Sequence, residues 1–494
     1  MNEMSETDQL IPLSNATLND LPAAIQRPTY DRSALRAGIV HIGLGNFHRA
    51  HQAWYLHRLM QQGLAQDWAI VGAGVRSGDA QMRARLEAQD HLTTLIELDP
   101  EGTRIEVTGA MIDFLPVAED NGPLIACLSD PAIRIVSLTV TEGGYFIAQD
   151  TGGPDLDHPE LLHDIAHPAT PRTAFGAIIA GLRARRLAGH GPFTVQSCDN
   201  LQGNGDITRD LVVSLARAMD PALADWIEAE CAFPNSMVDC IVPATGPDEL
   251  ARVRASGIED AAPVTHENFR QWVIEDHFCA GRPDWNRVGA VFTDDVVPYE
   301  SMKIRMLNAG HQLLANAGEL LSIATIADCM ADADIAAFFA QVQRAEIAPH
   351  VTAVAGMTAE EYVTLITRRF ANPQIRDTTR RVAFDGLSRH RGFLHPIIRD
   401  ALAAGHRVEG LALAEALWAR MCAGLREDGS EIAPNDPEWD VLHAAATEAR
   451  TDPRAWLALY ADLAEDPRFC APFEQALRRV WQDGTRSVLH SYVS

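Results

Sequence analysis

The segment from Gly38 to Leu59 constrains the fold more than any other stretch of the 494-residue chain. Ile39–Ile42 is a short apolar run typical of a buried strand, Gly43-Leu44-Gly45 is a tight turn, and Phe47 onward has a helical pattern. Strand, glycine turn and helix together predict a dinucleotide-phosphate cradle, because glycines let the backbone approach the pyrophosphate. His48 stands in place of the third glycine of G-x-G-x-x-G, so an ordinary strand-to-helix turn remains an alternative.

A second apolar run, Trp68–Val75, predicts the next strand. In this fold class the end of that strand carries the group that binds the adenosine ribose. Asp79 could accept bonds from the ribose hydroxyls and would repel a 2′-phosphate, which favours NAD over NADP. It lies farther from the first glycines than the usual spacing of about 20 residues, and a helix N-cap is its alternative role. The predicted cofactor-binding residues are Ile42, Gly43, Leu44, Gly45, Asn46, Phe47, His48, Arg76 and Asp79.

The pattern of strands and helices divides the chain into two parts. Further strand-like runs alternate with helix-length stretches, which favours a parallel sheet with crossovers; they lie at Leu92–Leu98, Arg104–Val107, Ile133–Val140 and Phe193–Ser197. Beyond residue 300 strand signals vanish and amphipathic helices follow. We therefore predict an α/β Rossmann-type dinucleotide-binding domain over 1–297, including an irregular N-terminal lead-in, and a mostly α-helical domain over 298–494.

The stretch KIRMLNAGH, Lys303 to His311, is the strongest candidate for catalysis. We predict a helix with Pro298 in its first turn and Gly318 as its stop. At roughly 100° per residue, Lys303 and His311 lie within a quarter turn of each other, and Asn308 lies somewhat beyond. Burial among apolar neighbours favours a neutral lysine, which can act as a general base, while the amide and imidazole can donate to an oxyanion. The alternative is a surface helix with an extended lysine and a hydrogen-bonded histidine.

The composition of the chain limits the classes of binding partner and the compartment that we expect. A formal net charge of -26 argues against nucleic acid and anionic membranes as partners. The N-terminus, MNEMSETDQ, does not resemble a signal peptide, and the eight cysteines are scattered without C-x-x-C spacing. We expect a cytoplasmic protein, a monomer or small homo-oligomer, without a metal. His48 and His51 could form half a metal site on a helix, but buried, hydrogen-bonded packing is the preferred interpretation.

Eight motifs occur in a specific order: GIVHIGLGNFHRAHQ, TEGGY, SCDN, FPNSMVD, QWVIED, GRPDW, DDVVPYE and K-x4-N-x2-H. With them the chain resembles, over nearly its whole length, the polyol-specific long-chain dehydrogenases of the mannitol dehydrogenase and D-mannonate oxidoreductase group. The resemblance implies a Rossmann-type domain that binds NAD, a helical domain, an active site between them and no metal. It implies interconversion of D-mannitol and D-fructose. The alternatives are D-mannonate oxidation (fructuronate reductase), whose substrate carries a carboxylate, and a non-catalytic NAD-binding protein.

The resemblance also implies roles for individual residues. Lys303 is the general base, Asn200 and Asn308 stabilise the oxyanion, and His311 holds a substrate hydroxyl. Glu142 and Glu300 lie near Lys303 and relay its proton, and Asp239 and Arg381 contact substrate. Three departures from the family pattern are Cys240, where arginine is usual, Gly78, where an acid often precedes Asp79, and the segment 385–393. Arg381, Arg389 and Arg391 are the candidate contacts for a carboxylate.

Overall fold

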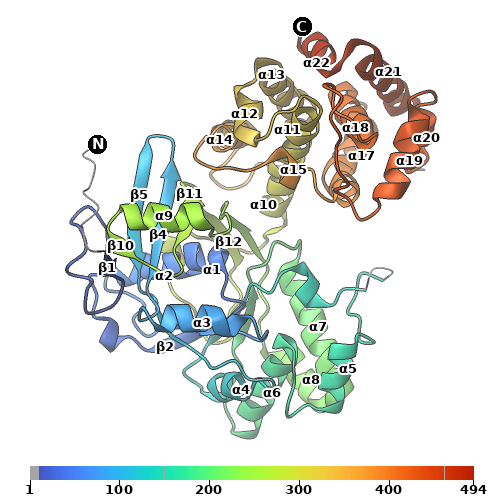
Figure 1. Ribbon diagram of the computed structural model, residues 1–494. Coiled ribbons are helices and arrows are strands. Elements are labelled where there is room, and N and C mark those ends of the chain that lie inside the picture. The colour runs from blue at the N-terminus through green and yellow to red at the C-terminus, as the bar shows by residue number, and fades with distance from the viewer. Residues whose placement is uncertain (1–9, 149–150, 461) are drawn as a thin grey trace. The chain divides into compact units, whose positions relative to one another are not determined.

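The computed structural model describes residues 10–148, 151–460 and 462–494 (Figure 1). The chain forms two compact units, Met1–Val297 and Pro298–Ser494, which we call unit 1 and unit 2 and describe separately. In the described part of the chain, no helix combines the length and the apolar character needed to cross a membrane.

A five-stranded parallel sheet forms the centre of unit 1. Its order is β6-β3-β2-β7-β8, and every neighbouring pair is parallel. The strands are β2 (Ala37–Ile42), β3 (Ala69–Ala73), β6 (Met111–Phe114), β7 (Ile135–Leu138) and β8 (Thr194–Ser197). This arrangement confirms the predicted Rossmann-type fold. The first strand of the motif, β2, is central, so the turn after it lies where the strand order reverses, the usual place for ligands in such sheets.

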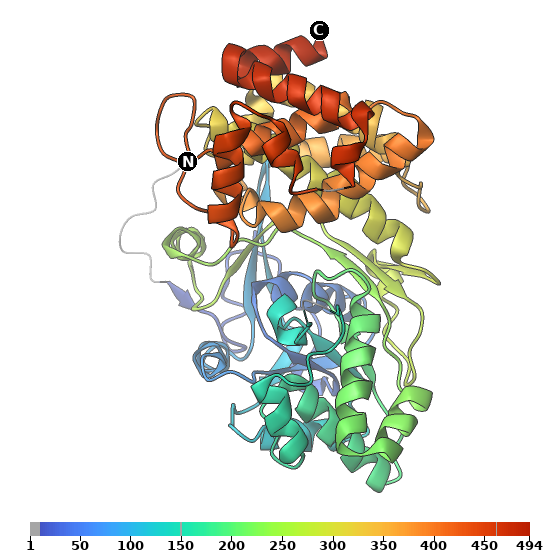
Figure 2. The same ribbon diagram turned by 90° about the vertical axis from the view of Figure 1, so that its right-hand side faces the viewer.

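Helices pack on both faces of this sheet (Figures 1 and 2). Successive side chains of β2 enter different cores: Ile39 packs in one cluster, and Val40 and Ile42 pack in another. The helices of unit 1 are α1 (Asn46–Ala50), α2 (Gln52–Met60), α3 (Asp79–Glu87), α4 (Gly122–Ser129), α5 (Pro159–Ala166), α6 (Ala174–Leu187), α7 (Asn204–Met219), α8 (Pro221–Glu230) and α9 (Pro247–Ala255).

Two of the predicted strands do not belong to the parallel sheet. β4 (Thr93–Asp99) and β5 (Gly102–Thr108) pair antiparallel, and β11 (Val264–Glu267) extends them into a separate sheet. The expectation of crossovers was wrong here, because Asp99 pairs with Gly102 and so short a connection permits only a hairpin. The remaining strands pair as β13-β12-β9 and β1-β10; they are β1 (Ile11–Pro12), β9 (Ser236–Asp239), β10 (Ile258–Glu259), β12 (Gln271–Glu275) and β13 (Val291–Thr293).

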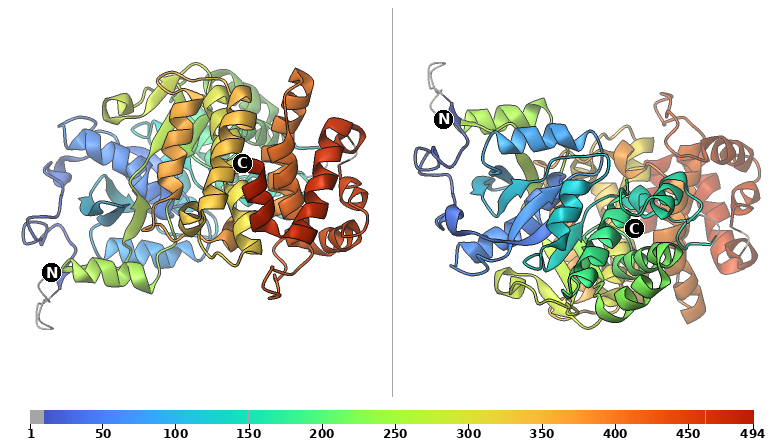
Figure 3. Two further views of the ribbon diagram at one scale, coloured as in Figure 1. Left: turned by 90° about the horizontal axis from the view of Figure 1, so that it is seen from above. Right: turned by 90° about the horizontal axis from the view of Figure 1, so that it is seen from below.

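Among the described residues of unit 2 the regular secondary structure is helical, and the helices are joined by loops that contain isolated bridges. The core of unit 2 is built around α11 (Ala309–Leu320) and α18 (Glu409–Cys422), which pack against each other (Figures 1 and 3). The helices are α10 (Val297–Met302), α11 (Ala309–Leu320), α12 (Ile326–Ala331), α13 (Ala333–Val342), α14 (Ala359–Phe370), α15 (Thr379–Val382), α16 (Gly386–Arg389), α17 (His395–Ala404), α18 (Glu409–Cys422), α19 (Trp439–Ala449), α20 (Arg454–Leu457), α21 (Pro467–Asp483) and α22 (Thr485–Val493).

The helix predicted to begin at Pro298 departs from the prediction in two ways. Lys303–Asn308 is a π-helical turn between α10 and α11, so the helix is not α-helical throughout. Gly318 does not end it, because α11 continues to Leu320. A Cβ on Gly318 would lie 2.4 Å from Sγ of Cys329, so this glycine instead allows α11 to pack closely against the helix that contains Cys329, Ile326–Ala331. Pro298 does lie in the first turn of α10, as predicted.

Candidate functional site

The glycine turn after β2 fits between the ends of two neighbouring strands. Gly43 has a φ of +92°, and a Cβ there would lie 2.2 Å from the carbonyl oxygen of Thr139, just beyond β7. Its N–H donates to the carbonyl of Ala73 at the end of β3 (3.1 Å). A Cβ on Gly45 would meet no atom within 4 Å. The backbone at Gly45 is therefore open to a ligand, whereas Gly43 must be glycine for the turn to form.

The helix after this turn is interrupted. α1 ends at Ala50, and His51, with φ −116° and ψ −94°, separates it from α2. His48 and His51 therefore do not lie on one continuous helix, contrary to the prediction. Among the described residues no group of three side chains could hold a metal ion.

His48 is buried, as predicted, but without the expected hydrogen bonds. Its ring stacks on that of His41 with centroids 3.4 Å apart. Neither ring nitrogen of His48 hydrogen-bonds another residue in the described part of the chain. Burial holds the pKa of His48 well below its ordinary value and lowers the pKa of His41 to about 3, so both rings are neutral near pH 7.

Asp79 lies against the carboxyl end of β3. It is the first residue of α3, and its Oδ2 accepts a hydrogen bond from the backbone N–H of Arg76 (2.9 Å). A Cβ on Gly74, directly after β3, would lie 2.2 Å from Cβ of Asp79. The carboxylate thus stands where the ribose-binding group is predicted, and Arg76 is exposed beside it. The cap role is only partly realised, because the N-cap residue of α3 is Gly78.

A buried carboxylate joins the loops that follow β7 and β8. Asp199 accepts hydrogen bonds from the backbone N–H groups of Val140 and Thr141 (both 2.9 Å) and from the hydroxyl of Tyr145 (2.7 Å). Burial raises the pKa of Asp199. Thr141 has a φ of +67°, a strained conformation for a residue other than glycine.

Asp199 thereby holds the segments that carry two predicted catalytic residues. Glu142 follows Thr141 and is exposed in a 3-10 turn, and Asn200 follows Asp199 and is also exposed. Sequence reasoning missed the role of Asp199 because Asp and Asn in SCDN also suit a turn. The available signal was the carboxylate's position directly after a buried strand.

Asp239 is the last residue of β9 and is buried, as expected for a residue within an apolar run. A carboxylate in such a position needs a polar partner. It lies in the β13-β12-β9 sheet, where it pairs in register with Gln271 of β12. Cys240, at the departure from the family pattern, is half-buried beside it.

In unit 2 the π-helical turn changes how the predicted catalytic residues face. Lys303 is 8 % exposed and Glu300, one turn earlier, is 4 % exposed. In an α-helix Lys303 and Asn308 would be separated by roughly 140° around the axis. A π-helix bonds residues five apart, as the N–H of Ala309 does to the carbonyl of Ile304, so Lys303 and Asn308 lie closer to one side than predicted.

His311 has an unused ring nitrogen. Its ring stacks on Phe370 with centroids 4.2 Å apart. Within the described residues, nothing hydrogen-bonds its buried Nε2. Burial lowers the pKa of His311 to about 4, so the ring is neutral near pH 7 and can hydrogen-bond a hydroxyl.

Arg381 is already paired. Its Nε and Nη2 donate to the two carboxylate oxygens of Asp377 (2.7 and 2.6 Å). This hydrogen bonding raises the pKa of Arg381, whose side chain is 63 % exposed while that of Asp377 is 6 % exposed. In the divergent segment Arg389 donates to the carbonyl of Val382 (2.7 Å), and His390 bonds Glu415 (2.7 Å).

Family models match most of the chain. The model described as mannitol dehydrogenase Rossmann domain matches residues 37–287, and the one described as mannitol dehydrogenase C-terminal domain matches residues 295–481. The mannitol 2-dehydrogenase of Cereibacter sphaeroides is 53% identical over 474 residues, which cover 95% of this chain and 99% of the relative. The polyol:NADP oxidoreductase of Gluconobacter oxydans is 39% identical over 431 residues, covering 86% of this chain and 88% of the relative.

Two solved structures are similar to the chain over nearly its whole length. The mannitol 2-dehydrogenase of Pseudomonas fluorescens, in a ternary complex with NAD and D-mannitol, is 39% identical with a TM-score of 0.84, covering 98% of this chain and 99% of that one. A substrate-free D-sorbitol dehydrogenase is 35% identical with a TM-score of 0.90, covering 97% and 100%.

Proposed function

The chain belongs to the mannitol dehydrogenase family, and we propose that it is an NAD-dependent polyol 2-dehydrogenase that interconverts D-mannitol and D-fructose. The observation that carries the proposal is the π-helical turn of unit 2, in which buried Lys303 and half-buried Asn308 are five residues apart. His311 follows, with a ring Nε2 that no described residue hydrogen-bonds. A base, an amide donor and a hydroxyl-binding imidazole are what oxidation of a secondary alcohol requires without a metal.

In the proposed mechanism Lys303, as the neutral amine, removes the proton from the C2 hydroxyl. The amides of Asn308 and Asn200 donate to the oxygen as negative charge develops on it, the task that zinc performs in metal-dependent alcohol dehydrogenases. His311 holds a second hydroxyl through Nε2. Glu142 and Glu300 pass the proton on from Lys303, and Asp239 and Arg381 contact the polyol. We propose these roles on the family's motif positions.

The residues around the glycine turn fit a dinucleotide. Gly43 turns the chain, the open side of Gly45 leaves room for phosphate, and Asp79 at the end of β3 can accept the ribose hydroxyls. Ile42, Leu44, Asn46, Phe47, His48 and Arg76 complete the proposed cofactor-binding set. NAD, when bound, supplies the hydride acceptor.

The pairing of Arg381 bears on the alternative substrate. A mannonate carboxylate needs a cationic partner, and both donors of the Arg381 fork toward Asp377 are already engaged. Arg389 and Arg391 each donate one hydrogen bond to a backbone carbonyl, of Val382 and Leu459 respectively. A neutral polyol needs no such cation, so the pairing favours mannitol. We propose small-molecule polyol and ketose partners, no nucleic acid, and a monomer or small homo-oligomer.

A substrate panel tests the proposal. Purified protein is assayed by NADH absorbance with D-mannitol, D-sorbitol, D-arabitol and D-mannonate, each with NAD and with NADP. We expect the highest kcat/KM for D-mannitol with NAD. A higher kcat/KM for D-mannonate would assign the chain to the oxidation of sugar acids, and the absence of turnover with every substrate would leave a non-catalytic NAD-binding protein.

A further inference from the structure

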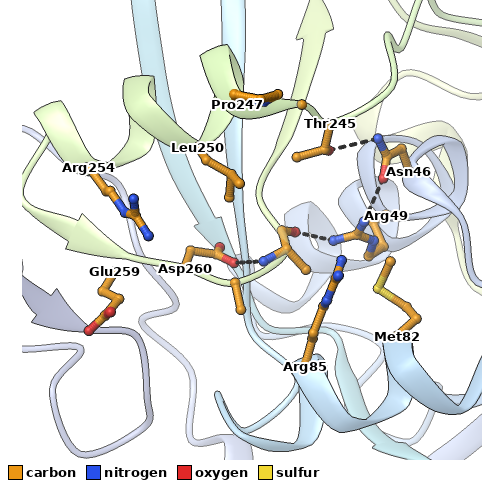
Figure 4. Close-up of a pocket in the computed structure, with 13 residues that line it drawn as sticks. Asn46, Arg49, Met82, Arg85, Thr245, Pro247, Leu250, Arg254, Glu259 and Asp260 are labelled. Carbon is orange, nitrogen blue, oxygen red and sulfur yellow. Dashed lines mark hydrogen bonds between the residues drawn. The ribbon is translucent and has the colours of Figure 1, made fainter.

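A pocket of about 490 Å³ lies within unit 1 (Figure 4). Its walls come from α1, α3, α9 and the segment around β10. A pocket of this volume is within the range that binds small molecules. The proposed catalytic and substrate-contacting residues do not line it, and only Asn46 is shared with the proposed cofactor-binding set.

Three arginines line this pocket: Arg49 from α1, Arg85 from α3 and Arg254 from α9. In Figure 4 the guanidinium groups of Arg85 and Arg254 point inward from their helices. In the described part of the chain neither makes a side-chain hydrogen bond or an ion pair. Arg83, two residues before Arg85, instead pairs with Glu87 (3.0 Å).

Arg49 is buried, and its hydrogen-bond acceptors among the described residues are all neutral. It donates to the carbonyl of Ala262, to Oδ1 of Asn46 (2.7 Å) and to the carbonyl of Gly45 (3.3 Å). The pKa of Arg49 is lowered to about 10, chiefly by burial; the charge of Asp260 opposes this shift and the charge of Arg85 adds to it. The cations of Arg49 and Arg85 therefore repel each other, and an anion bound to both would relieve that repulsion.

The acidic groups in the lining do not neutralise these arginines directly. Asp260 accepts from Nε2 of Gln89 (2.8 Å) and from the backbone N–H groups of Thr94 and Ala262 (both 2.7 Å), so its oxygens are occupied. The exposed carboxylate of Glu259 points away from the centre of the pocket in Figure 4.

We propose that this pocket binds a small phosphate-type dianion at Arg49 and Arg85, with Arg254 facing them from the α9 wall. Guanidinium forks match phosphate oxygens, and Arg49 and Arg85 lie near each other in Figure 4, where one compact anion can accept from both. The apolar lining residues Met82, Pro247 and Leu250 leave room for an uncharged moiety beside the anion. The anion is inorganic phosphate or the phosphate group of a small ester. This inference does not depend on the proposed catalytic activity.

The test is calorimetric titration of dialysed full-length protein with inorganic phosphate and with glucose 6-phosphate at constant ionic strength, both without NAD and with saturating NAD. We compare the native protein with the double variant Arg85→Gln/Arg254→Gln and with the control Arg252→Gln, an exposed arginine of α9 outside the pocket. Losing two charged contacts should weaken binding about tenfold or more, whereas the control should change it less than about twofold. Tighter binding of the ester than of phosphate would identify a phosphorylated metabolite, and equal binding would identify the free ion.

Three results would overturn the inference. They are the absence of binding heat with both probes, equal affinity in the native protein and the double variant, and binding that NAD abolishes competitively, which would place the anion in the cofactor cleft. Activity of the double variant with D-mannitol serves as the measure of its folding, since neither arginine belongs to the proposed catalytic or cofactor-binding set.

Discussion

At the scale of single residues, Lys303 is the side chain on which the proposed chemistry depends. Lys303→Ala should lower kcat by about 10²–10⁴-fold, the usual contribution of a general base, while NADH binding followed by fluorescence stays nearly unchanged. In the native enzyme polyol oxidation should rise with pH, because only the neutral amine accepts the proton, and ketose reduction should fall.

The control for this variant is Arg344→Ala, which removes an exposed cation that pairs with Glu360 at the surface of the same unit. It should leave kcat within about twofold of the native value, since exposed ion pairs contribute little. If Lys303→Ala keeps most of its activity, or no longer binds NADH, the lysine is structural.

Asp79 is the residue that should decide the choice of cofactor. Replacing Asp79 by Asn removes the charge that repels a 2′-phosphate, a repulsion worth about 1–4 kcal/mol at contact distance. We expect the ratio of kcat/KM for NADP to that for NAD to rise about tenfold, measured against Ser77→Ala, an exposed neighbour without a carboxylate. A native enzyme that uses both cofactors equally would contradict the ribose-binding role.

At the scale of elements, Gly310 connects the π-helical turn to the helices around it. A Cβ on Gly310 would lie 2.7 Å from Nε2 of Gln343 and 2.9 Å from Phe339, and the same Nε2 donates to the carbonyl of Met306 inside the π-helical turn (2.7 Å). Gly310→Ala should therefore lower both Tm and kcat. Overpacking costs about 1–3 kcal/mol, which exceeds the roughly 1 kcal/mol gained in helix propensity.

The matched control is Gly392→Ala, where the added Cβ would meet no atom within 4 Å. It should keep or raise Tm in thermal unfolding monitored by circular dichroism. An unchanged kcat in Gly310→Ala, together with a raised Tm, would show that the Gln343 contact does not shape the turn.

Element boundaries show what the sequence could and could not predict. The β2 strand and its turn were predictable because short apolar runs and glycines act locally. The β4–β5 hairpin was misassigned because strand patterns alone do not show which strands pair. The π-helical turn was missed because an α-helical period was assumed. The expectation that His48 is hydrogen-bonded was wrong because ring stacking can replace hydrogen bonds in a core. The meeting of Asp199 with the loop after β7 joins residues far apart in the sequence, which no local pattern encodes.

At the scale of the whole molecule, buried histidines make stability depend on pH. Burial lowers the pKa of His41 and of His266 to about 3 and that of His311 to about 4. The unfolded chain has histidines near pKa 6.5 and therefore binds more protons below that pH. The contribution of these histidines to the free energy of unfolding is therefore fully present above about pH 6.5. It falls with acidification toward pH 3–4, by roughly 1.4 kcal/mol per pH unit for each histidine.

Urea unfolding between pH 7 and pH 4 measures this slope. His41→Asn removes one such group and should make the dependence shallower by about 1.4 kcal/mol per pH unit. Stability that stays constant from pH 7 to pH 4 in the native protein would contradict the buried, neutral state of these rings.

Metal independence also belongs to the whole molecule and stays a prediction. Activity should survive exhaustive dialysis against EDTA, because the proposed mechanism assigns charge stabilisation to amides. Elemental analysis should find no stoichiometric zinc. Activity that EDTA removes and a divalent ion restores would refute the proposed division of labour between Lys303 and the two asparagines.

The contact between Gly43 and the Thr139 carbonyl limits the sequences to which this chain can evolve. Any substitution at position 43 brings a Cβ to 2.2 Å from a backbone oxygen, so no second substitution at position 139 can make room, because the obstacle is not a side chain. Two residues later, at Gly45, the same change meets no atom. The two glycines of this motif are thus retained for different reasons. The fold requires Gly43, whereas Gly45 can be substituted without a clash unless selection for ligand binding retains it.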